Sequence, residues 1–250
     1  MLNMLLVGCN GKMGRAVTAA VAGRCDCRIL AGVDLNTESS AGFPVYANPF
    51  NCPAEPDVAV DFSHPSGLET LLAYAKERRL PLVIGATGYT GEQIAAIKAA
   101  CAQIPIFFTA NMSMGVNLLA SLCKKAAAVL GDQFDVEIIE KHHNQKVDAP
   151  SGTALMLARA VEEGLSYTPQ YVYDRHSERR PRDHREIGFS SIRGGNIVGE
   201  HEVMFAGHDE ILTLSHSARS KEVFAVGAVN AALFLADKPA GLYDMGDLIK

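Results

Sequence analysis

The stretch EKHHNQKVDAPSGTAL, residues 140–155, concentrates groups that could bind and protonate a small molecule. It holds the adjacent pair His142 and His143, a lysine at Lys146, and a helix-start sequence at Ser151. Imidazolium and ammonium groups and the free N–H groups of a helix start all attract a negatively charged ligand. The combination therefore predicts a site for a small, multiply negative ligand. A solvated polar loop with a purely structural role is the alternative.

A helix is predicted to start inside this stretch. Pro150 and Ser151 are boundary residues, and the apolar positions that follow recur at helical spacing. Backbone N–H groups in the first turn of a helix have no partner within it. We therefore expect the N–H groups near Ser151, Gly152 and Thr153 to be unpaired donors suited to a carboxylate. One helix start beside a Lys/His cluster is what a dicarboxylate requires.

A metal site built on His142 and His143 is the obvious rival. Neighbouring residues of a strand point to opposite faces, so these two would not easily share one ion. Lys146 close by would also repel a divalent cation. The separations of the other candidate histidines match no pattern of metal ligands: His201, His208 and His216. No metal is expected.

The N-terminal sequence GCNGKMG predicts a dinucleotide site. Gly8, Gly11 and Gly14 follow a first apolar strand, where glycines let a pyrophosphate approach the helix start. On their own the glycines could form only a tight turn. Asp34 ends the second predicted strand and can accept hydrogen bonds from ribose hydroxyls, which strengthens the prediction. Two further turns at strand ends could line the cofactor, GATG (85–88) and TANM (109–112).

The first part of the chain alternates strands and helices, which is typical of a parallel, doubly wound sheet. Strands are predicted at 4–8, 27–34, 57–63, 81–88 and 104–111, and helices at 14–23, 67–80 and 92–103. The pattern then changes to a long amphipathic helix (115–131), a half-solvated strand (134–143), turn-separated strands from residue 186 and a last helix (221–237). We expect an open mixed or antiparallel sheet there. The polar stretch 173–186 is expected to be a mobile solvated loop, with a share in a ligand or subunit contact as the alternative.

Composition narrows the class of protein. The chain has 250 residues, 48% of them hydrophobic, and a formal net charge of −5, which argues against broad nucleic-acid binding. Its six cysteines show no paired metal-ligand spacing and are expected to be reduced. No signal peptide and no apolar run of membrane-spanning length are apparent. A cytoplasmic protein without membrane contact is predicted.

The motif EKHHNQKVDAPSGTA closely resembles the signature of the dihydrodipicolinate reductase family of lysine biosynthesis. The likeness runs the length of the chain and includes GCNGKMGRAV, VDFSHP, VIGATG, ANMSMGVN, IRGGNIVGEH and GLYDMGDLI. It implies a Rossmann-type α/β domain plus an α+β domain whose sheet assembles a homotetramer. The implied boundaries are 1–111 with 218–250 for the nucleotide domain and 112–217 for the substrate domain.

The resemblance also implies the reaction and its residues. A cyclic dicarboxylate would be reduced to tetrahydrodipicolinate with hydride from the nicotinamide, in the diaminopimelate route to lysine. His142 would be the catalytic acid/base and Lys146 the proton donor, while the substrate would be bound by His143, Ser151, Gly152 and Thr153. The cofactor would be lined by Gly8, Cys9, Asn10, Gly11, Lys12, Met13, Asp34, Gly85, Ala86, Thr87, Thr109, Ala110, Asn111 and Met112.

NADH is the expected preferred cofactor, with NADPH usable but poorer. A 2′-phosphate would bring negative charge against Asp34, and family members that tolerate NADPH usually carry an arginine just after this acidic position. Here Leu35, Asn36 and Thr37 follow, and only Lys12 could partly compensate.

Two other functions remain open. A nucleotide-sensing regulator would keep the glycine loop but would not need the His142/Lys146 pair. A semialdehyde dehydrogenase would carry a catalytic cysteine in its second domain, where this chain has only Cys123 within an apolar helix.

Overall fold

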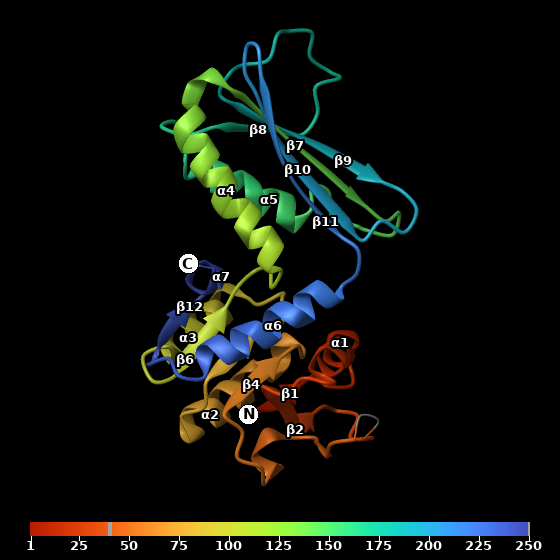
Figure 1. Ribbon diagram of the computed structural model, residues 1–250, viewed down its shortest axis with the longest axis vertical. Coiled ribbons are helices and arrows are strands. Elements are labelled where there is room, and N and C mark those ends of the chain that lie inside the picture. The colour runs from red at the N-terminus through yellow and green to blue at the C-terminus, as the bar shows by residue number, and fades with distance from the viewer. Residues whose placement is uncertain (40–41, 250) are drawn as a thin grey trace. The chain divides into compact units, whose positions relative to one another are not determined.

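The computed structural model describes residues 1–39 and 42–249 and divides the chain into two compact units (Figure 1). One unit comprises Met1–Met114 and Glu222–Lys250, and the other Gly115–Lys221. Lys250, the last residue of the predicted nucleotide domain, lies outside the described residues. The division of nucleotide and substrate binding between the two units stays a prediction.

The first unit is built on a seven-stranded parallel sheet in the order β12-β6-β5-β4-β1-β2-β3. This order, running outward from β1 in both directions, confirms the predicted Rossmann-type doubly wound sheet. Its strands are β1 (Leu2–Val7), β2 (Cys27–Val33), β3 (Val45–Tyr46), β4 (Val58–Asp61), β5 (Leu82–Ile84), β6 (Pro105–Phe108) and β12 (Gly241–Tyr243). Its helices are α1 (Lys12–Val21), α2 (Leu68–Arg78), α3 (Gly91–Ala100), α6 (Glu222–Leu235) and α7 (Met245–Leu248), with 3₁₀ turns at Pro49–Asn51 and Pro65–Gly67.

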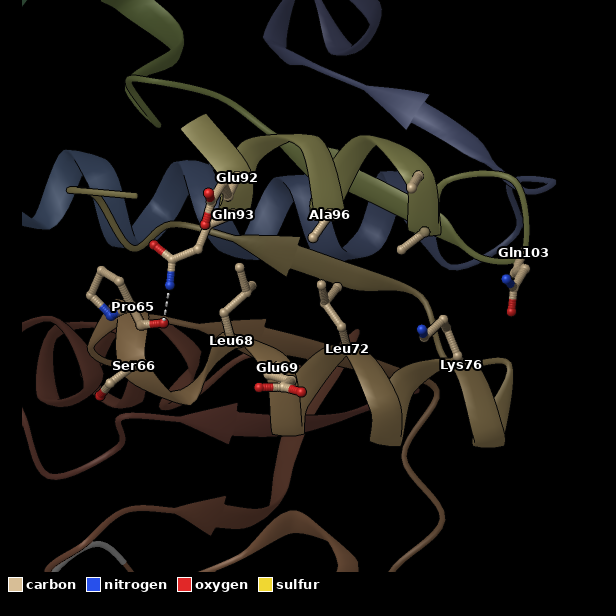
Figure 2. A pocket seen from close by; sticks show the side chains of 12 residues that line it. Pro65, Ser66, Leu68, Glu69, Leu72, Lys76, Glu92, Gln93, Ala96 and Gln103 are labelled. Carbon is tan, nitrogen blue, oxygen red and sulfur yellow. Dashed lines mark hydrogen bonds between the residues drawn. The ribbon is translucent and has the colours of Figure 1, made fainter. Parts of the chain in front are cut away.

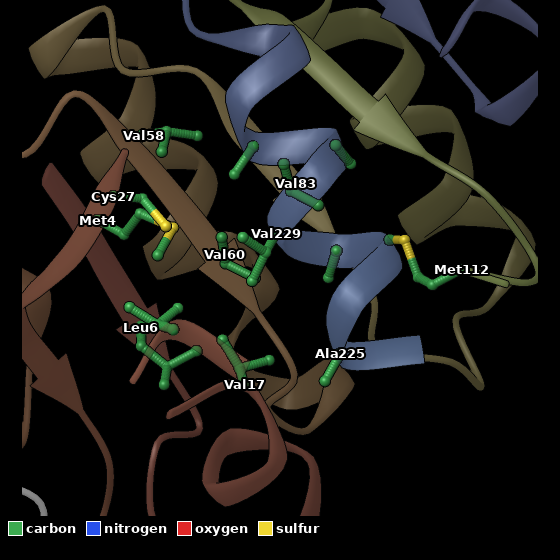
Figure 3. Packing of buried hydrophobic residues seen from close by; sticks show 14 of the residues in the cluster. Met4, Leu6, Val17, Cys27, Val58, Val60, Val83, Met112, Ala225 and Val229 are labelled. Atoms are coloured by element: carbon green, nitrogen blue, oxygen red, sulfur yellow. The ribbon is translucent and has the colours of Figure 1, made fainter. Parts of the chain in front are cut away.

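Each face of this sheet carries its own core, as a sheet covered on both sides requires. Side chains of α2 and α3 pack on one face, and those of α1 and α6 pack on the other. Figure 3 shows Val229 of α6 beside Val60 of the sheet, and Ala225 and Val83 belong to the same cluster. Small residues let α6 come close: a Cβ on Gly227 would lie 1.7 Å from the Met112 carbonyl oxygen. The returning C-terminal helix is therefore an integral part of the first unit.

The second unit holds a five-stranded sheet in the order β11-β10-β7-β9-β8. Strand β10 is antiparallel to β7 and β11, whereas β7, β8 and β9 run parallel, so the predicted open mixed sheet is confirmed. The elements are α4 (Met114–Leu130), a 3₁₀ turn at Gly131–Gln133, β7 (Asp135–His142), α5 (Gly152–Glu162), β8 (Gln170–Val172), β9 (Glu186–Arg193), β10 (Gly199–Ala206) and β11 (Ile211–Ala218).

Helices α4 and α5 cover one face of this second sheet (Figure 1). Burial alternates along β7, so that Val136, Ile138, Glu140 and His142 are all buried. Since successive side chains of a strand point to opposite faces, a carboxylate and an imidazole share the helix-covered face with the core. The alternation of side chains along β7 thus places two ionisable groups, those of Glu140 and His142, in the interior.

The stretch 173–186 is a largely exposed loop whose arginines form ion pairs. Arg175 and Arg182 both form ion pairs with Glu137 of β7, and Arg182 also pairs with Asp135. Glu186, fully buried, is paired with Arg175 and Arg180. The expected solvent exposure of this loop is therefore confirmed, and its mobility stays a prediction; its arginines pair with carboxylates on two strands.

Within the described part of the chain, one helical segment, Met114–Gln133, is long and apolar enough to cross a membrane by length and composition. Its residues Leu119, Cys123 and Ala127 are buried against the second sheet, and Lys124 and Lys125 lie in its middle. These contacts are those of a core helix.

Candidate active site

The residues predicted to line a dinucleotide come together at one edge of the first sheet. All the strands concerned are parallel, so their carboxyl ends meet at the same edge, where ligands of open α/β sheets bind. The β1–α1 turn carries Gly8 to Met13, the turn after β5 carries Gly85 to Thr87, and the turn after β6 carries Thr109 to Met112.

The β1–α1 turn has the backbone shape that a phosphate requires. Gly8 has φ +77°, and a Cβ at this position would lie 2.8 Å from the Phe62 backbone, so only glycine fits. A Cβ on Gly14 would lie 2.2 Å from the Gly8 carbonyl oxygen, which shows how closely the helix approaches the strand. Among the described residues, no side chain caps α1 at Gly11. The first N–H groups of α1 are thus available to an anion.

Asp34 follows β2 and is held by the glycine loop. Its Oδ2 accepts a 2.9 Å hydrogen bond from the Asn10 N–H, and its Oδ1 accepts one of 3.1 Å from the Asn36 N–H. The Asn10 side chain in turn donates to the carbonyl oxygens of Asn36 and Glu38. A carboxylate has about four acceptor positions. Asp34 is therefore fixed in place and still able to accept from ribose hydroxyls.

Two of the predicted cofactor residues direct their side chains into the core. Cys9 is 3% exposed and Met112 is 4% exposed, and both belong to the cluster under α6. Burial, with the negative charge of Asp34, raises the pKa of the Cys9 thiol to about 11. These two positions could meet a cofactor only through their backbone.

In the second unit, His142 lies at the end of β7 beside a buried carboxylate. Its Nδ1 is 2.6 Å from Glu140 Oε2, and Glu140 is 1% exposed. Burial opposes ionisation of Glu140, but hydrogen bonds from Arg193 and His142 outweigh it and lower its pKa to about 2. Glu140 is therefore an acceptor, and His142 donates through Nδ1. Burial lowers the pKa of His142, with Lys146 and Arg193 acting in the same direction and Glu140 against them.

Arg193, at the end of β9, binds both oxygens of Glu140. Its Nη1 and Nη2 lie 2.9 and 2.6 Å from Oε2 and Oε1, the fork geometry of a strong arginine–carboxylate pair. Nη2 also donates to the Asp148 carbonyl oxygen at 2.7 Å. Arg193 thus ties the loop that carries Lys146 to the strand that carries His142.

Ser151 corrects one expectation from the sequence. Its N–H donates to Glu140 Oε1 at 3.2 Å, its Oγ caps α5 by accepting from the Ala154 N–H, and it is 2% exposed. The Ser151 Oγ also lies 2.9 Å from Nε2 of His201. The prediction that the Ser151 N–H is unpaired was wrong, because the buried carboxylate of Glu140 takes it.

Lys146 and the start of α5 converge on one carboxylate. Lys146 Nζ lies 2.8 Å from Asp148 Oδ1, and a hydrogen bond from the Gly152 backbone adds to this pair in lowering the pKa of Asp148. The Gly152 N–H, also expected to be unpaired, thus has a partner. Two groups predicted to hold a substrate carboxylate already hold one of the protein's own. That these donors bind a substrate stays a prediction, as it does for His143 and Thr153, which lie close by in sequence.

Sequence reasoning missed Glu140, Arg193, Asp148 and His201 as parts of this cluster. Glu140 could have been found, because it precedes His142 by two residues and must share its face of a strand. Arg193 and His201 come from other strands, and nothing in their local sequence indicates this contact. The His142 and His201 rings meet edge to face at 5.1 Å between centroids.

A separate groove of about 510 Å³ lies between α2 and α3 (Figure 2). Leu68 and Leu72 form its apolar wall, Glu69, Lys76 and Glu92 lie at its rim, and Gln93 Nε2 donates to the Pro65 carbonyl oxygen at 2.8 Å. None of the predicted site residues lines it. Its mixed lining has none of the converging charge found around Glu140.

Both halves of the chain match one family of known proteins. Residues 2–112 match the family described as "Dihydrodipicolinate reductase, N-terminus", and residues 115–249 match "Dihydrodipicolinate reductase, C-terminus". The chain is 47% identical over 245 residues to a protein of Clostridium tetani named 4-hydroxy-tetrahydrodipicolinate reductase, covering 98% of this chain and 96% of the relative. A protein of the same name from Caldanaerobacter subterraneus subsp. tengcongensis is 47% identical over 250 residues, covering 100% and 99%.

A solved structure with a similar fold is "Dipicolinate bound Dihydrodipicolinate reductase from Paenisporosarcina sp. TG-14". It superposes with a TM-score of 0.82 at 25% identity and covers 98% of this chain and 97% of that one. With both halves matched in order and the relatives covered almost end to end, this chain belongs to the dihydrodipicolinate reductase family of oxidoreductases.

Proposed function

We propose that this protein reduces 4-hydroxy-tetrahydrodipicolinate (dihydrodipicolinate) to tetrahydrodipicolinate with NAD(P)H, in the diaminopimelate route to lysine. The observation that carries the proposal is the cluster of His142, Lys146 and the start of α5, in which Glu140 pairs with His142 and Asp148 pairs with Lys146. It stands in the same chain as a dinucleotide-type sheet edge, which is what a pyridine-nucleotide reductase needs. A nucleotide-sensing regulator would have no use for the first of these features.

The substrate would be a ring dicarboxylate. Lys146 and the Gly152 N–H already bind the carboxylate of Asp148, whose side chain is 57% exposed and can move away. A substrate carboxylate would replace it on the same donors, with His143 and the Thr153 N–H adding contacts. The structural relative with dipicolinate bound, itself an aromatic ring dicarboxylate, supports this class of ligand.

His142 and Lys146 would handle protons. Reduction of a conjugated ring leaves negative charge, which a positioned acid must neutralise as it develops. Neutral His142 holds its proton on Nδ1 against Glu140, so that Nε2 is the nitrogen that takes up or delivers a proton. The reduction consumes one hydride and one proton, and Lys146 would donate that proton and also provide the positive charge that holds the substrate.

The cofactor would occupy the glycine-loop edge of the first sheet. A bound nicotinamide supplies the hydride, and the protein supplies binding and orientation. The uncapped start of α1 would hold the pyrophosphate, and Asp34 would accept from the ribose hydroxyls. NADH should be preferred over NADPH, because no arginine stands beside Asp34 to hold a 2′-phosphate.

The functional unit would be a homotetramer in the cytoplasm. The face of the second sheet opposite α4 and α5 carries Ile139, Met204 and Thr213 between polar neighbours, and Ile192 is 46% exposed. Such a face could pack on a second copy of the same sheet. All six cysteines are free, as expected for a reducing compartment.

The test is whether the protein oxidises NADH when the product of dihydrodipicolinate synthase is added. Oxidation is measured as the loss of absorbance at the nicotinamide band. A buffer blank and an assay without the synthase control for spontaneous reactions. Dependence of the rate on both the protein and the synthase product is expected. Binding of NADH without any oxidation would instead favour the regulator.

A further inference from the structure

Glu140 is the most buried charged residue in the neighbourhood of His142, and it transfers no proton in the chemistry proposed above. Its two oxygens receive four hydrogen bonds: one from His142, two from Arg193 and one from the Ser151 N–H. A buried carboxylate is stable only when its acceptor positions are filled in this way. These partners come from three different elements: His142 ends β7, Arg193 ends β9 and Ser151 precedes α5.

We propose that Glu140 is a positioning residue that fixes the ring of His142 with Nε2 toward the substrate. The inference rests on the proposed function, in which His142 transfers a proton. Because an ionised carboxylate only accepts, the contact to Glu140 Oε2 requires the proton of neutral His142 to sit on Nδ1. The lone pair then lies on Nε2.

The surroundings of Nε2 agree with this orientation. A Cβ on Gly199 would come within 3.1 Å of His142 Nε2, so glycine there leaves room beside the nitrogen. The ring also meets His201 edge to face. Burial lowers the pKa of His201 to about 4, with His142, His216 and Lys146 contributing and Glu140 opposing. A neutral His201 packs against His142 without repelling a proton on it.

Glu140 also holds the loop that leads from Lys146 to the start of α5. Through Arg193 the same carboxylate is joined to the Asp148 carbonyl oxygen, and directly it is joined to the Ser151 N–H. These two contacts bracket the loop that leads from Lys146 to the start of α5. Glu140 therefore holds the proton-transfer group and the anion site in one fixed relation.

The test compares Glu140→Gln with Glu200→Gln in the full-length protein. Glu200 pairs with Lys141 at 3.1 Å on the opposite face of the same sheet, half-exposed, and serves as the matched control. Nitrogen-15 NMR of labelled histidine, with His142 assigned by loss of its signals in His142→Gln, reports which ring nitrogen carries the proton. The wild type and Glu200→Gln should show Nδ1–H, and Glu140→Gln should show a mixture or Nε2–H. The same Nδ1–H form in all three would overturn the proposal.

Kinetics provide the second readout. Carboxylates that hold a functional histidine from behind contribute about 10- to 100-fold, so kcat of Glu140→Gln should fall by that factor with KM for NADH unchanged. The groups facing His142 are Glu140, Lys146, Arg193 and His201, and only Glu140 raises its pKa. Its removal should move the alkaline fall of kcat to lower pH. An unchanged pH profile with unchanged kcat would count against a positioning role.

Two outcomes separate this proposal from the proposed function. If the wild type lacks reductase activity, the proposed function fails, while the NMR comparison still decides whether Glu140 orients His142. If Glu140→Gln does not fold, Glu140→Asp keeps the charge but withdraws it from His142 by one methylene. That variant should lose kcat while NADH binding is kept, and wild-type kcat in it would overturn the proposal.

Discussion

At the scale of single residues, the decisive feature is a neutral histidine held between a carboxylate and several cations. His142 donates to Glu140 from Nδ1, while Lys146 and Arg193 discourage its protonation. Such a group can accept or deliver a proton near neutral pH with little rearrangement. Lys146, 21% exposed in its side chain, remains accessible to a ligand.

Replacing His142 with Gln should lower kcat by about 10²- to 10⁴-fold, the usual contribution of general acid–base catalysis. KM for NADH should change little, because the cofactor residues belong to the other unit. Lys146→Ala should reduce kcat at least as much and also raise KM for the substrate, since a positive charge is lost. Steady-state kinetics with both substrates varied measure these constants. Wild-type turnover in both variants would remove this loop from the chemistry.

We predict that a single side chain, Asp34, sets the cofactor preference. NADH should have the higher kcat/KM, and the difference should narrow as salt screens the repulsion between Asp34 and a 2′-phosphate. Asp34→Ala should improve NADPH relative to NADH, because it removes that repulsion together with the ribose contacts. Glu38→Gln removes an equal charge nearby and is the matched control. A clear NADPH preference in the wild type would contradict the prediction.

At the scale of elements, α6 illustrates how closely packed the first unit is. Gly227 lies so near the Met112 carbonyl oxygen that no side chain fits, and the helix is buried through Ala225, Ala228 and Val229. Helix packing at this distance requires small residues along the whole contact. The structure of the first unit therefore depends on the last part of the chain.

Gly227→Ala should destabilise the protein by about 2–3 kcal/mol, because the added methyl must displace backbone. Gly91→Ala is the control: it opens α3, and a Cβ there would meet nothing within 4 Å. That substitution should be neutral or stabilise by up to about 1 kcal/mol. Thermal and urea unfolding give both values. Equal stability of the two variants would show that α6 does not pack as described.

At the scale of the whole molecule, the helices that the described part of the second unit contains, α4 and α5, both pack on the same face of its sheet. A sheet face bearing Ile139, Met204 and Ile192 is suited to association between identical copies.

Light scattering coupled to size exclusion should give four times the mass of one chain. Ile139→Asp should reduce this mass, because a charge would be buried at the interface. Leu35→Asp, at a side chain 96% exposed in the first unit, should leave it unchanged. A monomeric wild type at micromolar concentration would contradict the tetramer.

Local sequence alone was sufficient for several features. The alternation of strands and helices, the glycine turn before α1, Asp34 after β2 and the start of α5 all follow from short-range rules. So does the burial of His142, since the two-residue period of β7 places it with Val136 and Ile138. These rules operate within about ten residues, so one sequence suffices to apply them.

Tertiary structure decided the rest of the candidate site. Glu140, Arg193, Ser151 and His201 come from β7, β9, the start of α5 and β10, and their contact depends on strand order and register. The ion pair between Lys146 and Asp148 and the ion pairs of the arginines in 173–186 also depend on how the chain folds. A buried charge needs several partners at once, and residues distant in sequence supply them only after the chain has folded. That is why the sequence could suggest His142 and Lys146 as a reacting pair but could not place Arg193 and His201 beside them.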